Sequence, residues 1–115
     1  MVETITREDL KAKLDQGAKL TLVEALSETY YADKHLPGAV NIPHDKVDAL
    51  APDLLPDRSA LIVVYCASAP CKNSGIAARR LAELGYTNVR DYHEGKADWI
   101  AAGLPVETGA ATRAA

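Results

Sequence analysis

The amino-acid sequence predicts an α/β domain built on a central, mostly parallel sheet. Segments of strand character alternate along the chain with segments of helical periodicity, which is typical of parallel α/β folds. One predicted strand, Leu61–Tyr65, is short, continuous, apolar and rich in β-branched residues. A strand of this kind is expected in the middle of a sheet that is covered on both faces. The 115 residues, about half of them apolar, are enough for one domain with its own core.

Capping and turn residues delimit the elements of the first half of the chain. Thr6 and Ser27 each precede a helical segment and can act as N-caps, and Gly17 follows the first of these segments as a stop. The Pro37-Gly38 pair predicts a turn. The elements predicted here are a helix over residues 7–16, a strand over 20–24, a helix over 28–34, a brief strand over 40–42 and a helical turn over 45–50.

The second half contains the strongest helical pattern. Ala77, Leu81 and Leu84 recur on one face of a predicted helix, and Gly85 closes it. A last helix is predicted to stop at Gly103, shortly before a proline. The elements predicted here are the strand over residues 61–65, a helix over about 73–84, a strand over 89–92 and a helix over 97–102.

Charge and hydropathy exclude several classes of partner. The net charge is −3 and the basic residues do not cluster, so no nucleic-acid partner is expected. The longest apolar run, residues 60–66, is far too short to span a bilayer, so no membrane partner is expected either. The first residues have neither a basic start nor an apolar stretch. We therefore expect a cytoplasmic protein.

The two cysteines, Cys66 and Cys71, are the residues with the most chemical potential. In a reducing compartment, cysteines so close in sequence are interpreted as reactive or metal-binding rather than as a structural disulfide. A zinc site would need histidines brought in by the fold, because no metal-ligand spacing is present. We expect no metal.

Cys66 follows the central strand directly, and in parallel sheets ligands bind beyond the carboxyl ends of the strands. The loop after it leads into a helix, whose first N–H groups and macrodipole favour an anion. This predicts a reactive thiol of lowered pKa, whereas the competing interpretation is a small buried side chain. The predicted active-site loop consists of Ala67, Ser68, Ala69, Pro70, Cys71 and Lys72.

Four segments, taken in order, resemble the rhodanese domain family. The resemblance lies in residues 35–43, 63–66, 74–86 and 94–106. It implies a rhodanese-like three-layer α/β/α domain with a central, mostly parallel five-stranded sheet. We assign residues 1–107 to this domain and residues 108–115 to a flexible C-terminal tail. It also implies that Cys66 is the nucleophile and that the loop after it is the substrate cradle.

The resemblance further implies a sulfurtransferase. Such a protein moves sulfane sulfur from a donor, thiosulfate or another persulfide, to a thiophilic acceptor through a persulfide on Cys66. It would need no cofactor. Its expected partners are a small-molecule sulfur donor and a thiol acceptor, with a protein sulfur acceptor as a further option.

The chain departs from the family pattern at two places, which leaves other functions open. Glu24 stands where many members begin an Asp-x-Arg motif. The loop is about two residues longer than the family's usual six-residue cradle, carries the extra thiol Cys71 and has Lys72 but no arginine. An arsenate reductase or phosphatase-like oxyanion enzyme is one alternative, although lysine lacks the fork of arginine. A thiol redox or persulfide-handling protein, with Cys71 as resolving thiol, is another. A non-catalytic interaction module is the third.

Overall fold

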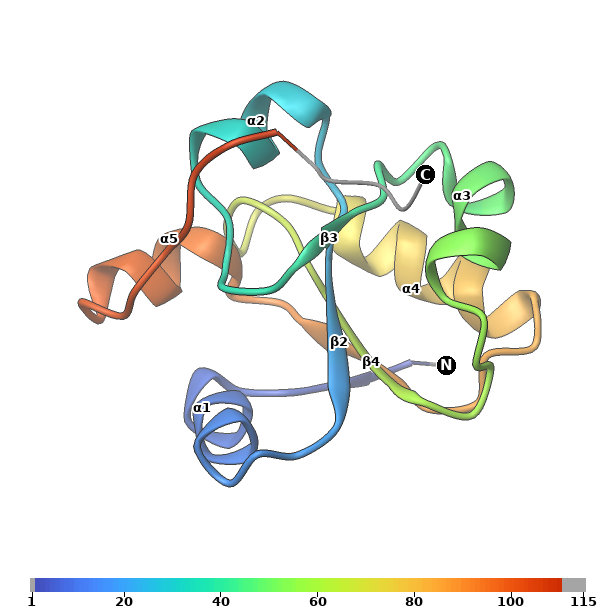
Figure 1. Cartoon of the computed structure of the whole chain (residues 1–115), viewed down its shortest axis with the longest axis horizontal. Coiled ribbons are helices and arrows are strands. Elements are labelled where there is room, and N and C mark those ends of the chain that lie inside the picture. Colours follow the sequence, from blue (N-terminus) through green and yellow to red (C-terminus); the bar gives the residue numbers. More distant parts are fainter. Residues whose placement is uncertain (1, 111–115) are drawn as a thin grey trace.

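Five parallel strands form the central sheet (Figure 1) in the computed structural model, which describes residues 2–110. Their order across the sheet is β1-β5-β4-β2-β3, so the apolar strand β4 is central as predicted. The predicted α/β class and the five-stranded parallel sheet are confirmed. The strands are β1 (Glu3–Thr4), β2 (Leu20–Glu24), β3 (Val40–Asn41), β4 (Leu61–Tyr65) and β5 (Val89–Tyr92).

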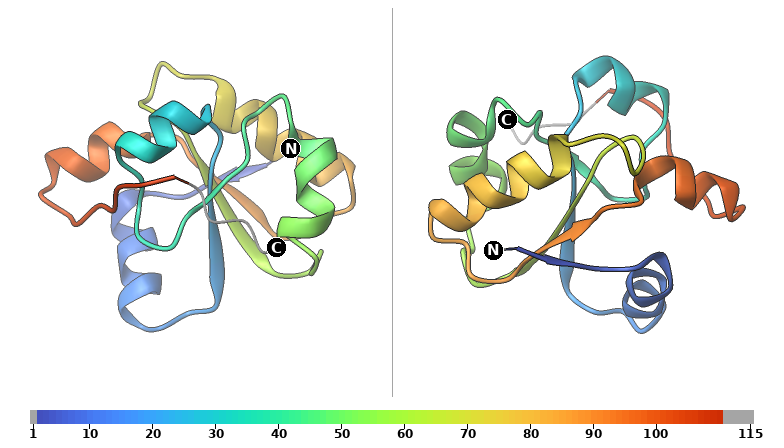
Figure 2. Two further views of the ribbon diagram at one scale, coloured as in Figure 1. Left: turned by 45° about the horizontal axis from the view of Figure 1, so that its top comes forward. Right: turned by 180° about the vertical axis from the view of Figure 1, so that it is seen from behind.

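Helices cover both faces of the sheet and complete the predicted three layers. Figure 2 shows α3 and α4 together on one side, with α1 and α5 on the other. The fourth helix in the sequence runs close to its predicted bounds, whereas α3 extends through Pro52 instead of ending before it. The helices are α1 (Arg7–Asp15), α2 (Glu28–Asp33), α3 (Val47–Leu54), α4 (Asn73–Glu83) and α5 (Gly95–Ala101).

Two hydrophobic layers hold the sheet between its helices. Along β4 the side chains alternate: Ile62 and Val64 pack toward α3 and α4, while Val63 and Tyr65 pack toward α1 and α5. All four are buried. Trp99 packs α5 against the second layer. Because alternation places Tyr65 on the α5 side, the next residue, Cys66, faces α4.

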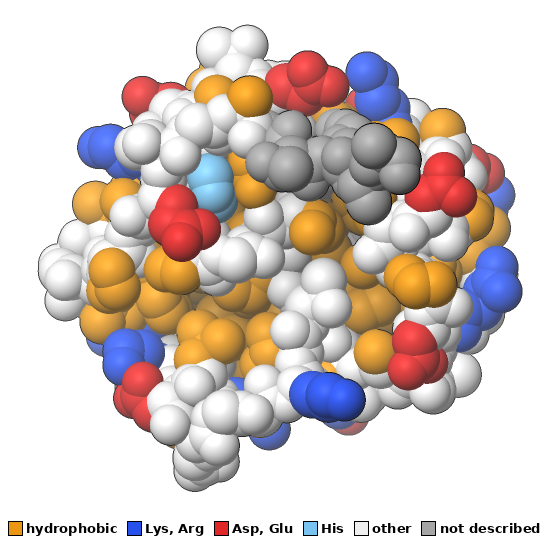
Figure 3. Space-filling view, viewed as in Figure 1, with side chains coloured by type: hydrophobic (Ala, Val, Ile, Leu, Met, Phe, Trp, Pro, Cys, Tyr) orange, Lys and Arg blue, Asp and Glu red, His pale blue; other side chains and the backbone are white. Residues whose placement is uncertain are grey.

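The surface agrees with the absence of a basic stripe in the sequence. On the face shown in Figure 3, basic and acidic side chains are interspersed around the rim. Each helix of residues 2–110 is too short or too polar to cross a bilayer. The cytoplasmic location remains a prediction. The flexibility of the predicted C-terminal tail also remains a prediction, because residues 111–115 lie outside the described part of the chain. Within residues 108–110, the amide of Gly109 donates to the carbonyl oxygen of Ala32 at 2.8 Å.

The start of α5 fixes the loop that follows β4. The amides of Lys96 and Ala97 donate to the carbonyl oxygens of Cys66 and Ala67, each at 2.8 Å. This approach requires glycine at position 95. Its φ is +76°, and a Cβ there would lie 2.7 Å from the Cys66 carbonyl oxygen, closer than real side chains come.

We therefore predict that Gly95→Ala destabilises the protein well beyond a matched control, Gly103→Ala. Gly103 has nearly the same φ, +75°, but nothing lies within 4 Å of its Cβ position. The control should cost only the left-handed strain, about 1 kcal/mol. Gly95→Ala should cost about 1–3 kcal/mol more, because backbone must shift to relieve the overlap. Urea unfolding of both variants measures the difference, and equal midpoints would contradict the close approach.

Candidate active site around Cys66

Cys66 occupies the predicted place between the end of β4 and the start of α4, and it is a free thiol. The residue is fully buried. Its Sγ donates to the Cys71 carbonyl oxygen at 3.5 Å. Ser74, in the first turn of α4, lies beside the sulfur, and its buried hydroxyl has no hydrogen-bond partner among the described residues, so it is free to donate to a thiolate. The helix N-terminus therefore reaches the sulfur through Ser74.

The charge state of this thiol differs from the prediction. Burial raises the pKa of Cys66 above its ordinary value, and its hydrogen bond with the Cys71 thiol raises it further. The Ser74 hydroxyl and amide lower the pKa of Cys66, but they do not offset the loss of solvent. The prediction of a lowered thiol pKa is therefore wrong. The sequence predicts the helix N-terminus, which lowers the pKa of Cys66, but it does not predict how deeply the thiol is buried, and burial raises that pKa by more.

The active-site loop divides into two parts with different neighbours. Ala67 is tied to α5 through its carbonyl, and Ser68 lies against Gly95. The Cys71 amide donates to the Ser68 carbonyl oxygen at 3.0 Å and turns the chain back toward α4. The other loop residues line a cavity of about 410 Å³ together with residues of α4 and of the β5 end. They are Ala69, Pro70, Cys71 and Lys72.

A buried ion pair beneath the loops was not predicted from the sequence. Glu24, at the end of β2, is fully buried, and both of its carboxylate oxygens accept from the Lys96 ammonium at 3.1 Å. The Tyr65 hydroxyl donates to the same carboxylate at 2.9 Å and accepts from the Leu36 amide at 3.0 Å. Burial raises the pKa of Glu24, and the Lys96 charge offsets part of that rise.

Lys96 thus supplies the cation that balances the buried Glu24 carboxylate. Its ammonium also donates to the carbonyl oxygens of Tyr30, within α2, and of Lys34, directly after that helix. The pair therefore joins β2, α2 and α5 directly below the Cys66 loop. The one sequence signal was a lysine next to a glycine in the segment after β5, which does not identify a partner 72 residues away.

The histidines do not gather around the cysteines. His35 stacks on Tyr31 with ring centroids 3.8 Å apart, and its Nδ1 lies 2.8 Å from the Tyr31 carbonyl oxygen. His93 lines the cavity beside the loop. Within residues 2–110, no group of three or more histidine, cysteine, aspartate or glutamate side chains is placed to hold a metal ion.

The fold and this loop define a parallel α/β domain in which a buried cysteine directly follows the central strand, with a second cysteine in the loop before the next helix. Residues 6–102 match the family model described as "Rhodanese-like domain". The chain belongs to the rhodanese-like domain family, as the sequence resemblance predicted.

Two curated proteins and one solved structure illustrate the relationship. The chain is 35% identical over 108 residues to the HTH-type transcriptional regulator Rv0324 of Mycobacterium tuberculosis, covering 94% of this chain and 46% of that protein. It is 36% identical over 61 residues to the thiosulfate sulfurtransferase PspE of Escherichia coli, covering 53% of this chain and 57% of that protein. The chain spans about half the length of these relatives.

The crystal structure of thiosulfate sulfurtransferase from Pseudomonas aeruginosa superposes with a TM-score of 0.85 at 25% identity. The match covers 97% of this chain and 21% of that one. Sulfurtransferase activity is thus supported at the level of the family.

We predict that Lys96→Met costs about 3–5 kcal/mol of unfolding free energy, because it leaves the Glu24 carboxylate buried without its cation. Lys11→Met is the matched control: Lys11 pairs with Asp15 on the exposed face of α1, so its loss should cost less than about 1 kcal/mol. Chemical denaturation of both variants tests this. Similar costs for the two would show that the Lys96 pair does not hold these elements together.

We predict that alkylation of Cys66 by iodoacetamide accelerates with pH without a plateau below about pH 8.5, the pKa of a free cysteine. The reason is that burial holds the Cys66 pKa above that value. The measurement uses Cys71→Ser, so that one thiol reacts. Adding Ser74→Ala should move the profile to still higher pH, because a donor to the thiolate is lost. A plateau already reached near pH 7 would contradict the raised pKa.

Proposed function

We propose that the protein is a sulfurtransferase that carries sulfane sulfur as a persulfide on Cys66. The observation that carries the proposal is the placement of Cys66 at the carboxyl end of the central strand, with the Ser74 amide and its unpartnered, buried hydroxyl beside the sulfur. These donors can stabilise the thiolate that attacks and the persulfide that results. Membership of the rhodanese-like family, and similarity to thiosulfate sulfurtransferases, support this chemistry.

With thiosulfate as donor, the loading step balances without an oxidant. The Cys66 thiolate attacks the outer sulfur of thiosulfate, a new S–S bond forms, and sulfite leaves with the electron pair of the broken bond. A thiol acceptor then attacks the outer sulfur of the persulfide and regenerates the Cys66 thiolate. Persulfide donors and protein thiol acceptors react by the same two displacements, so both belong to the proposed partner classes. No step needs a metal or an organic cofactor.

The burial of Cys66 gives the loop a part in this cycle. No donor contacts a fully buried sulfur, so part of the loop over residues 67–72 must open for loading. Lys72 stands next to α4 and places a positive charge at the loop end, which favours an anionic donor. A single ammonium does not grip an oxyanion bidentately, which disfavours the phosphatase and arsenate reductase alternatives.

We predict that incubation with thiosulfate adds one sulfur atom, about 32 Da, to the intact protein, and that Cys66→Ser abolishes the gain while sulfite release stops. Ser74→Ala should slow loading about tenfold, since a hydrogen bond to a charged group contributes about 1.5–3 kcal/mol. Ser59→Ala is the matched control, because Ser59 bonds only to Asp57 in an exposed turn.

Intact mass spectrometry and a sulfite assay give both readouts. Failure of the wild-type protein to gain mass from thiosulfate, 3-mercaptopyruvate and glutathione persulfide would overturn the proposal. So would a gain of mass that persists in a correctly folded Cys66→Ser variant.

A further inference from the structure

The two cysteines differ in access although they are in contact. Cys66 is fully buried, while Cys71 is half-buried and lines the cavity of about 410 Å³ between the loop, α4 and the end of β5. The Cys66 thiol donates to the Cys71 carbonyl oxygen at 3.5 Å, and the Cys71 side chain lies close enough to raise the pKa of Cys66. A small molecule in the cavity can therefore contact Cys71, which lines it, whereas Cys66 is buried behind Cys71 and does not line the cavity.

The charged groups around the cavity are of both signs and are unpaired. Lys72, Arg79 and His93 line it, and within residues 2–110 none of them has an ion-pair or hydrogen-bond partner for its side chain. Asp91 also lines it, and its Oδ1 is buried with no hydrogen-bond partner among the described residues. Unpaired buried oxygens are rare in folded proteins and point to a missing donor.

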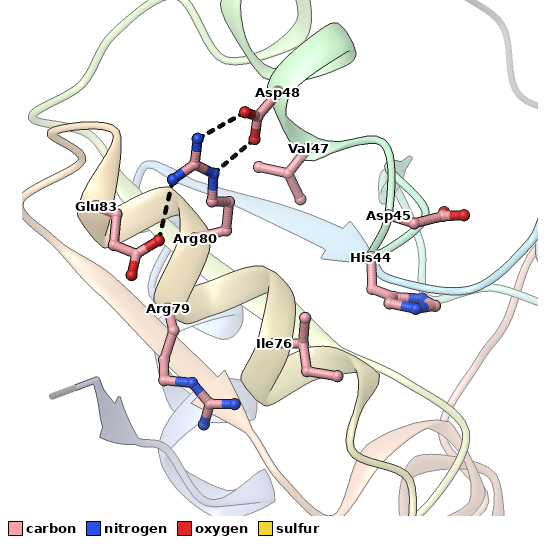
Figure 4. A pocket seen from close by; sticks show the side chains of 8 residues that line it. All are labelled: His44, Asp45, Val47, Asp48, Ile76, Arg79, Arg80 and Glu83. Carbon is pink, nitrogen blue, oxygen red and sulfur yellow. Dashed lines mark hydrogen bonds and ion pairs between the residues drawn. The ribbon is translucent and has the colours of Figure 1, made fainter.

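Arg79 differs in this respect from its neighbour Arg80. Figure 4 shows Arg80 turned toward Asp48 of α3, which it binds through two hydrogen bonds of 2.7 and 2.6 Å, while Arg79 extends away from that pair. Nη1 of Arg79 and Oδ2 of Asp91 each lie 3.7 Å from the position that a Cβ on Gly75 would occupy. Because residue 75 is glycine and has no side chain, space remains between the Arg79 guanidinium and the Asp91 carboxylate.

We propose that Cys71 relays sulfur from the Cys66 persulfide to a small acceptor thiol that carries both a carboxylate and an ammonium group and binds in this cavity. The acceptor carboxylate faces Lys72 and Arg79, and its ammonium faces Asp91. A thiol of the cysteine class has this pair of charges next to its sulfur. The relay rests on the proposed function, because it starts from sulfur already held on Cys66.

Both steps of the relay are thiol–persulfide exchanges, in which one S–S bond forms as another breaks, so neither step needs an external oxidant or reductant. The Cys71 thiolate attacks the outer sulfur of the Cys66 persulfide; the S–S bond to Cys66 breaks, and Cys66 leaves as thiolate with the electron pair. The acceptor thiolate then attacks the outer sulfur on Cys71 and leaves as its own persulfide, which returns Cys71 to a thiolate. Attack on the inner sulfur would instead give a Cys66–Cys71 disulfide and free sulfide.

The test loads the protein with thiosulfate, removes excess donor and follows single-turnover loss of the added sulfur by mass spectrometry. Four thiols separate the charges: L-cysteine, cysteamine without the carboxylate, 3-mercaptopropionate without the ammonium, and 2-mercaptoethanol with neither. We expect Cys71→Ser still to gain the added sulfur to the same final extent, whatever its loading rate, but to discharge it to L-cysteine at least tenfold more slowly. Fragmentation of alkylated, loaded wild-type protein should locate part of the added sulfur on Cys71.

The charge variants test the cavity itself. Arg79→Gln should slow discharge to L-cysteine and 3-mercaptopropionate about threefold to tenfold and leave 2-mercaptoethanol unchanged. Asp91→Asn should slow L-cysteine and cysteamine in the same way. Arg80→Gln is the matched control, since Arg80 is engaged with α3 and should change none of the four rates.

Each outcome decides between the two proposals. Failure of the wild type to load refutes the persulfide on Cys66 and with it the relay. Normal loading with equally fast discharge in Cys71→Ser refutes the relay alone, as does loss of two hydrogens with release of one sulfide, which marks a resolving disulfide. Equal rates for all four thiols, after allowance for their different acidities, would refute the assignment of the cavity to a zwitterionic acceptor.

Discussion

The loop that holds Cys66 is positioned by two backbone hydrogen bonds from the first turn of α5. The amides of Lys96 and Ala97 satisfy the carbonyls of Cys66 and Ala67, and this approach exists only because residue 95 lacks a side chain. The side chain of Lys96 extends into the protein interior and binds the carboxylate of Glu24 at the end of β2. The short segment over residues 95–97 therefore holds the backbone of the Cys66 loop through its amides and neutralises the buried Glu24 carboxylate through the Lys96 side chain. Three strands of the sheet end around this point.

The same burial that stabilises the site suppresses the resting nucleophile. A thiol with a raised pKa is mostly neutral at neutral pH, so the helix N-terminus contributes little to Cys66 before sulfur arrives. A persulfide is a stronger acid than the thiol from which it forms, so its anion gains more from the Ser74 donors. On this view the donors serve the loaded state more than the free thiol, and a slow, gated loading step is compatible with a stable persulfide.

Local signals predicted much of this architecture, and tertiary contacts account for what they missed. Short stretches of sequence are enough to recognise the apolar run of β4, the apolar face of α4 and the helix stops at Gly17, Gly85 and Gly103. The predicted α/β class and the predicted position of Cys66 after the central strand were therefore both correct. Strand β1 has only two exposed residues and exists through pairing with β5. The raised pKa of Cys66 and the partner of Lys96 depend on segments far apart in sequence, which no spacing rule connects.

Two thiols five residues apart differ in exposure because the two parts of the loop have different neighbours. Ala67 is bonded to α5 and Ser68 is wedged against Gly95, so the part next to Cys66 has little freedom. Beyond the turn at Ser68, residues 69–72 face a cavity and have fewer constraints. Any opening of the loop is therefore confined to the segment that carries Cys71. The nucleophile lies in the part of the loop that continues the sheet, and exchange with small molecules falls to the part that lines the cavity.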